Sequence, residues 1–255
     1  MHAPSFEQEY ERFRPMIRRL SNFALIGKKI EVWGEENFVR QGSNIIVGNH
    51  SGSFKDVATL FRIVPRPIFF TANKNIFKRQ ELNFLFRKHL KRHMKSLGLF
   101  VNLMLTPLKF LFVEYVSSNI AKIGTIPVDL DRRRREAIER CQEYLLQGRA
   151  IIALQGRGRV HGRDPHPYIR KFRKGSSIMA YNLLTRYGIS VPVTPLALYG
   201  THIPFPVPKT VIVNVGKPMQ IKDYLKGGEE ETIENFRSAL ETRVKTLFAE
   251  ALKAR

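Results

Sequence analysis

The chain has 255 residues, a length typical of one large domain. Apolar residues make up 43% and charged residues 25%, which excludes collagen-like, coiled-coil and wholly disordered proteins. Lys and Arg number 43 against 22 Asp and Glu, a net charge of +21, so we expect nucleic acid, an anionic membrane surface or a phosphorylated substrate as partner. The one cysteine, Cys141, excludes an intrachain disulfide and a multi-cysteine zinc site.

The N-terminal segment, residues 1–30, is expected to be helical. Residues 5–30 predict one or two helices, broken at Pro15, because proline interrupts helical hydrogen bonding. The first 20 residues contain no apolar run of the kind found in secretory signal peptides. We therefore treat 1–30 as a membrane-associating helical appendage to a domain that spans 31–255.

Strand-like and helical patterns alternate through 31–255. Strands are expected near 29–34, 43–50, 66–72, 124–130, 150–154, 191–200 and 210–216. Helices are expected near 55–63, 137–148, 176–188 and 229–253. The alternation predicts a single α/β domain with a central mixed sheet flanked by helices.

Residues 78–116 have the composition of a membrane-contact insertion. Segment 78–95 carries seven Lys and Arg against one acid, Glu81, with apolar residues at helical spacing. Segment 97–116 is apolar but is interrupted by proline and charged residues, so we expect it to lie in a membrane interface. A buried core helix with a solvated basic face is the alternative. The interfacial prediction places the protein peripherally on the cytoplasmic face of a membrane, where anionic lipids attract basic segments.

Asn49 and His50 follow the apolar strand IIVG directly and precede the polar stretch SGSFKD. In open α/β folds, active groups gather where strands end. A histidine at such a place can deprotonate a hydroxyl, and Asp56 is the one acid close enough in sequence to fix its tautomer. Locally, a histidine that caps the following helix is an equally good interpretation.

Five blocks follow one another along the chain and read NHSGSFKD (49–56), FFTANKNIF (69–77), GTIPVDLDRR (124–133), ALQGRGRV (153–160) and VPVTPLALYGT (191–201). In this order they resemble the blocks of the glycerolipid acyltransferases, the lysophosphatidic-acid acyltransferase-like proteins that share an NHxSxxD signature. The resemblance covers roughly residues 30–218. Three departures are evident, and one is Leu130, which stands where the family carries an arginine just after the strand IPVD. Five residues separate His50 from Asp56 where the family has four, and this puts Lys55 at the usual position of the acid. Gln155 stands where the family carries a glutamate.

The resemblance implies a role for each matching residue. His50 would be the general base on the acceptor hydroxyl, and Asp56 its orienting acid. The acceptor phosphate would be held by Gly156, Arg157 and Arg159, with Lys74 near the site. Attack of a hydroxyl on a thioester beside a cationic phosphate clamp needs no metal, no cofactor and no nucleophilic residue, so Cys141 is expected to be inert core.

The resulting prediction is an O-acyltransferase at a membrane surface. It would move an acyl chain from acyl-CoA or acyl-carrier-protein to the hydroxyl of a lysophospholipid, with lysophosphatidate the first choice. One alternative is a catalytically impaired lipid-binding protein of the same fold. The other, a basic nucleic-acid-binding protein, lacks any zinc-finger, RNP-like or helix-turn-helix pattern, so we expect no nucleic-acid partner.

Overall fold

The computed structural model describes residues 6–52, 54–73, 78, 80, 124–128, 134–155, 169–203 and 207–254. The predicted membrane-contact insertion, 78–116, lies outside the described residues apart from Lys78 and Gln80. Its placement in a membrane interface therefore stays a prediction, and so does the division of the chain at residue 30.

In the described part of the chain, seven strands form one sheet in the order β1-β7-β6-β2-β5-β3-β4. The strands are β1 (Lys28–Trp33), β2 (Asn44–Asn49), β3 (Ile68–Asn73), β4 (Thr125–Val128), β5 (Ala150–Gln155), β6 (Val193–Tyr199) and β7 (Lys209–Val215). The helices are α1 (Phe6–Ala24), α2 (Phe54–Ile63), α6 (Arg134–Leu146), α7 (Gly175–Tyr187) and α8 (Glu229–Lys253), with short 3₁₀ helices η1 (Glu35–Asn37) and η4 (Ile221–Tyr224).

The directions of the strands create one edge where chain ends and loops collect. Neighbouring strands are parallel throughout, except that β6 and β7 are antiparallel. Strands β2, β3, β4, β5 and β6 therefore all end at the same edge of the sheet, where β1 and β7 begin. We call this the carboxyl edge. Ligands of open α/β sheets bind outside such an edge.

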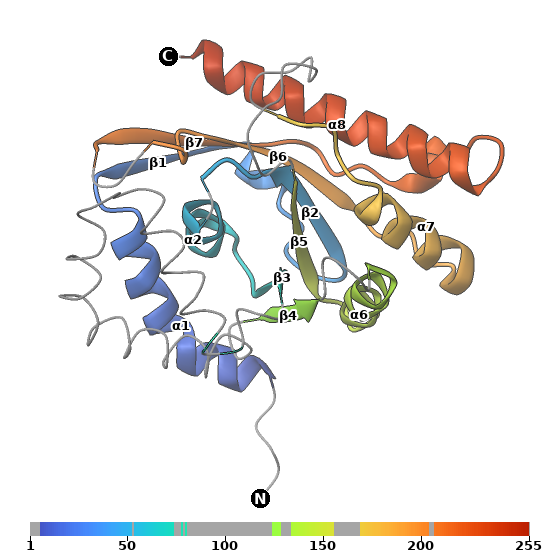
Figure 1. Cartoon of the computed structure of the whole chain (residues 1–255), viewed down its shortest axis with the longest axis horizontal. Coiled ribbons are helices and arrows are strands. Elements are labelled where there is room, and N and C mark those ends of the chain that lie inside the picture. Colours follow the sequence, from blue (N-terminus) through green and yellow to red (C-terminus); the bar gives the residue numbers. More distant parts are fainter. Residues whose placement is uncertain are drawn as a thin grey trace, which may run out of the picture.

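Helices cover both faces of the sheet, as Figure 1 shows, with α6, α7 and α8 on one face and α1 and α2 on the other. Strand β2 is buried along its whole length, as expected of a parallel strand covered on both faces. Its side chains alternate: Ile45 and Val47 enter the core under α8, whereas Ile46 packs with Leu60 of α2. The sheet thus separates two apolar cores.

The structure confirms the predicted single α/β domain with a mixed sheet, and each predicted strand and helix from β1 onward is present within a few residues. The predicted break at Pro15 is wrong, because α1 continues through it. Buried residues on either side of the proline, Tyr10, Ile17 and Leu25, keep the helix docked along its length. Within the described ranges, no helix is both long and apolar enough to cross a membrane.

Cys141 is buried on α6, and its burial raises the pKa of the thiol to about 12. Because the thiolate is the reactive form, we expect the native protein not to react with Ellman's reagent at pH 8. After unfolding in guanidinium chloride, one thiol per chain should react. Rapid stoichiometric labelling of the native protein would show that the interpretation of Cys141 as inert core is wrong.

Candidate active site

Asn49, the last residue of β2, fixes the backbone at the carboxyl edge. Its side-chain amide donates to the carbonyl of Leu198 over 2.9 Å, and its side-chain oxygen accepts the Leu198 N–H over 2.7 Å. The carboxamide thus continues the β2–β6 pairing by one more rung, with both of its polar ends buried. Consequently the chain leaves β2 in one defined direction, and the next residue is His50.

His50 and Asp56 form a hydrogen-bonded pair. His50 Nδ1 lies 2.8 Å from Asp56 Oδ2, and the carboxylate is fully buried while 15% of the imidazole side chain stays exposed. An ionised carboxylate can only accept, so Nδ1 carries the proton and Nε2 keeps its lone pair. This arrangement leaves Nε2 available to take a proton from an incoming hydroxyl.

Asp56 lies in the first turn of α2, where the helix dipole favours a negative charge. The same oxygen that contacts His50 accepts the backbone N–H of Gly52 over 2.8 Å. The other oxygen, Oδ1, is buried and has no hydrogen-bond partner among the residues that the structure describes. A single carboxylate oxygen therefore holds both the imidazole and the loop that connects it to the helix.

Lys55, which stands at the usual position of the acid, does not face His50. Its side chain is buried, and its ammonium group donates to the backbone carbonyl of Ile203 in the connection between β6 and β7. Burial, and secondarily the positive charge of Lys28, lower the pKa of Lys55. The longer spacing is therefore accommodated by the start of α2, which directs Asp56 to the histidine and Lys55 to the neighbouring loop.

Gly52 provides the room for the longer loop. A Cβ at this position would lie 2.4 Å from Cβ of Thr201 and 2.7 Å from its backbone oxygen. The hydroxyls of Ser51 and Thr201 are 3.4 Å apart. Gly52, in the loop between β2 and α2, thus packs against Thr201, shortly after β6, at a distance that only glycine permits.

The other predicted site residues, Lys74, Gly156, Arg157 and Arg159, lie outside the described residues. The described ends of their segments nevertheless reach the carboxyl edge. In the β2–β5 register, Asn49 pairs with Gln155, so the chain after β5 starts beside the residue that precedes His50. Strand β3 ends at the same edge with Asn73. The roles of these four residues stay predictions.

Gln155 joins the two described ends of the segment that contains the predicted phosphate clamp. Its side-chain oxygen accepts the backbone N–H of Arg173 over 2.6 Å, and its amide nitrogen donates to Ser176 Oγ over 3.2 Å. Close by, the N–H of Phe172 donates to Glu241 of α8 over 2.8 Å. The Gln155 amide thus uses its donor and its acceptor in one bridge between β5 and the start of α7.

Sequence reasoning missed the structural parts played by Lys55, Gln155 and Thr201. The motif comparison marked the first two only as departures, and it contained no signal for their partners, which lie far away in sequence. For Thr201 a signal did exist. It follows a strand that ends at the carboxyl edge, the same rule that singled out His50.

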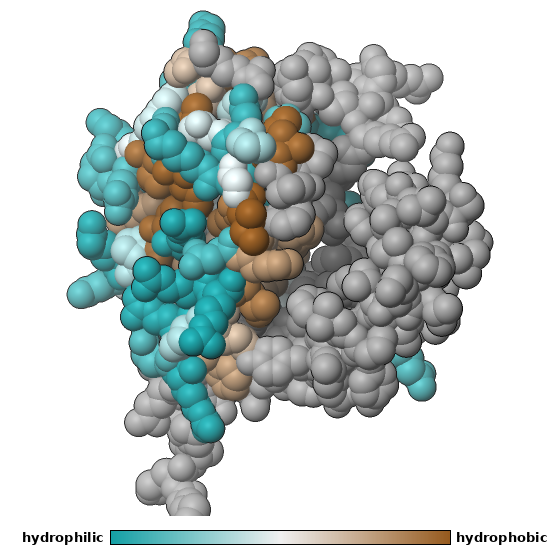
Figure 2. Space-filling model, turned by 90° about the vertical axis from the view of Figure 1, so that its left-hand side faces the viewer, coloured by the Kyte–Doolittle hydropathy of each residue, from teal (hydrophilic) through white to brown (hydrophobic). Residues whose placement is uncertain are grey.

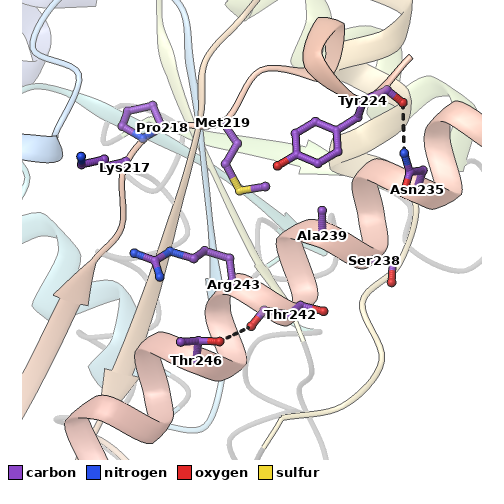
Figure 3. Close-up of a pocket in the computed structure, with 10 residues that line it drawn as sticks. All are labelled: Lys217, Pro218, Met219, Tyr224, Asn235, Ser238, Ala239, Thr242, Arg243 and Thr246. Carbon is purple, nitrogen blue, oxygen red and sulfur yellow. Dashed lines mark hydrogen bonds between the residues drawn. The ribbon is translucent and has the colours of Figure 1, made fainter. Parts of the chain in front are cut away.

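A groove of about 630 Å³ lies elsewhere, between α8 and the segment that follows β7. In Figure 3, Lys217, Met219 and Tyr224 line one side and Arg243 lines the other. Strand β7 runs away from the carboxyl edge, so this groove lies at the opposite edge from His50. Among the described residues, no group of three or more His, Cys, Asp or Glu side chains is placed to hold a metal ion.

Comparisons with known proteins agree with this geometry. A family model described as Acyltransferase matches residues 29–199, more than half of the chain. The structure is similar to the crystal structure of the 1-acyl-sn-glycerophosphate (LPA) acyltransferase PlsC from Thermotoga maritima, with a TM-score of 0.60 and 21% sequence identity. The likeness covers 99% of this chain and 85% of that one. No curated protein matches significantly in sequence. With the family model spanning both the His50–Asp56 pair and most of the sheet that holds it, the chain belongs to the acyltransferase family.

Proposed function

We propose that the protein transfers an acyl chain from acyl-CoA or acyl-carrier-protein to the hydroxyl of a lysophospholipid, with lysophosphatidate as the acceptor. The observation that carries the proposal is the pairing of a buried Asp56 with a partly exposed His50 at the carboxyl edge. The family match supports acyl transfer. The net charge of +21 suits a phosphorylated acceptor and an anionic surface.

In this mechanism His50 Nε2 accepts the proton of the acceptor hydroxyl as its oxygen attacks the thioester carbon. A C–O bond forms, the C–S bond breaks, and the imidazolium returns the proton to the departing thiolate. Asp56 holds the ring through Nδ1 and stabilises its transient positive charge. The ester and the free thiol are the products, and no group on the protein is consumed.

Arg157 and Arg159 are proposed to hold the acceptor phosphate, since arginine can pair two parallel N–H donors with phosphate oxygens. Two observations support this assignment. The residue before this stretch, Gln155, pairs with Asn49 in the sheet register, and the side chain of Gln155 closes the base of the segment on Arg173. Gln155 and Arg173, which stand on either side of the segment, are therefore bonded to each other next to the strand that ends before His50.

A lipid surface is proposed as the place of action. Several large apolar side chains are exposed near the carboxyl edge, among them Phe54 at the start of α2 (62% exposed) and Phe23 at the end of α1 (66% exposed). Ile26 and Val207 are exposed nearby. Lys28 contacts both segments, since its backbone N–H donates to the carbonyl of Leu25 and its ammonium group donates to the carbonyl of Val207. Figure 2, which views the side where α1 lies, shows apolar side chains gathered among hydrophilic ones.

The dyad is tested by removing each partner. His50→Ala should lower the rate of acyl transfer by about 10² to 10⁴, the usual contribution of a general base. Asp56→Asn should lose most of the rate, because an amide cannot stabilise the imidazolium. Thiol release with a panel of lyso-lipids, using acyl-CoA and acyl-carrier-protein as alternative donors, measures the rate.

Thermal unfolding of both variants should match the parent within a few degrees, so that loss of activity is not loss of fold. An active Asp56→Asn variant would mean that another acid orients His50. If the folded parent transfers no acyl group to any lyso-lipid, the protein is a lipid-binding member of the family and the proposed activity is wrong.

The close approach at Gly52 is tested by adding a methyl group. Gly52→Ala should lower acyl transfer by at least about 10-fold, because the new Cβ clashes with Thr201 and so shifts residue 52, whose own N–H binds Asp56. Gly175→Ala is the matched control, since a Cβ there meets no heavy atom within 4 Å. Equal activity of the two variants would contradict the tight packing of this loop.

Membrane contact is tested with the two exposed phenylalanines. Phe23→Ser and Phe54→Ser should each weaken binding to anionic vesicles by about 10-fold, given roughly 1.5–3 kcal/mol for a buried phenylalanine. Binding of the parent should also fall with salt. Tyr187→Ser is the control, because Tyr187 is 54% exposed and lies at the far end of α7. Vesicle sedimentation measures binding, and unchanged binding of the phenylalanine variants would exclude this surface.

A further inference from the structure

Two lysines are buried where the connection between β6 and β7 meets α2 and β1. Lys55 donates to the carbonyl of Ile203, and Lys28 donates to the carbonyl of Val207. Both side chains are buried, although lysine is rarely buried in proteins. Burial lowers the pKa of Lys28, and burial followed by the charge of Lys28 lowers the pKa of Lys55.

The connection that these lysines hold is also the surface against which the His50 loop rests. Near its start it contains Thr201, which packs on Gly52 and approaches the Ser51 hydroxyl. Just before it, Leu198 is bonded to the Asn49 side chain. A displacement of this connection would therefore move Gly52, whose N–H binds the same carboxylate oxygen as His50.

Lys55 links the β6–β7 connection directly to the His50–Asp56 pair, because it precedes Asp56 on α2. In the first turn of α2, the side chain of Asp56 binds His50, and the side chain of Lys55 binds the backbone carbonyl of Ile203. Burying a cation costs free energy that an apolar side chain would not. Functional sites are where such costly groups are found, which favours a role beyond packing.

We propose that Lys55 and Lys28 are positioning residues, which hold the two described parts of the β6–β7 connection at Ile203 and Val207, keep Thr201 against Gly52, and thereby keep Asp56 and His50 in reacting geometry. The inference rests on the proposed acyl transfer for its kinetic test. Neither lysine is assigned a contact with donor or acceptor. Their removal should therefore change kcat and leave both KM values nearly as they are.

The test replaces Lys55 by methionine, which keeps the length of the side chain and removes the ammonium group. We expect kcat to fall ~10- to 100-fold, the scale of a misplacement of about 1 Å, with both KM values changing less than ~3-fold. Lys55→Arg, which keeps a donor for the Ile203 carbonyl, should recover much of the loss. Arg62→Met removes an exposed cation from the same helix and should behave as the parent.

A second pair of measurements does not depend on turnover. Hydrogen exchange of the backbone amides in 198–203 should be faster in Lys55→Met than in Arg62→Met, because the carbonyl of Ile203 has lost its partner. His50 should react with diethyl pyrocarbonate at a changed rate. If Lys55→Met does not fold, Lys28→Met supplies the same comparison. If both fold, the double variant should lose less than the product of the single losses, because either change releases the same connection.

Three outcomes would overturn the proposal. Faster exchange with unchanged kcat would mean that the connection does not position the dyad. A raised KM with unchanged kcat would make the lysines substrate contacts. Unchanged exchange with unchanged His50 reactivity would mean that they hold nothing. If the parent transfers no acyl group, the proposed function fails, while exchange and His50 reactivity still decide whether the lysines position the pair.

Discussion

The hydrogen bond between His50 Nδ1 and Asp56 Oδ2 requires the end of a strand and the start of a helix to be fixed within a fraction of an ångström of one another. Strand β2 fixes the position of His50, because the strand is buried on both faces and bonded to β5 and β6 on either side. Helix α2 fixes the position of Asp56, because Leu60 of this helix lies in one apolar core with Ile46 of β2. The pair is thus as rigid as the middle of the sheet.

The strand that follows the site is as important as the strand that carries it. Because β7 runs antiparallel to β6, the chain turns back at the carboxyl edge, where Thr201 packs against Gly52 in the loop after His50. A parallel continuation would have taken the chain away through a crossover helix. The one antiparallel pairing in this sheet therefore provides the loop with its supporting surface.

Local patterns were sufficient to predict most of the strands and helices, since apolar periodicity and terminal glycines act over a few residues. The proximity of His50 and Asp56 could also be predicted, because both flank one short loop. The direction of the Lys55 side chain could not be predicted in this way. One residue along a helix turns a side chain by about 100°, so which of two neighbours meets the histidine depends on where α2 begins.

The bridges made by Gln155 and Lys55 could not be predicted for a different reason. Their partners, Arg173 and Ser176 in one case and Ile203 in the other, come from segments brought together only by the order of strands in the sheet. Likewise, Pro15 looked like a helix break, but burial of Tyr10 and Ile17 on either side outweighs the local preference of proline. Tertiary contacts decided each of these points.

The position of β1 at the edge of the sheet has a consequence for the order of assembly. Among the described strands, β1 pairs with β7 alone, and Lys28 lies opposite Lys209, so this pairing joins residues that are far apart in the sequence. On a ribosome, β1 has no strand to join until β7 has emerged, and Ile30 and Val32 stay without their core until then. Contacts of such long range slow folding and leave apolar surface uncovered in the meantime. A chaperone, or an early encounter with lipid, would act on this N-terminal segment by covering Ile30 and Val32 during synthesis.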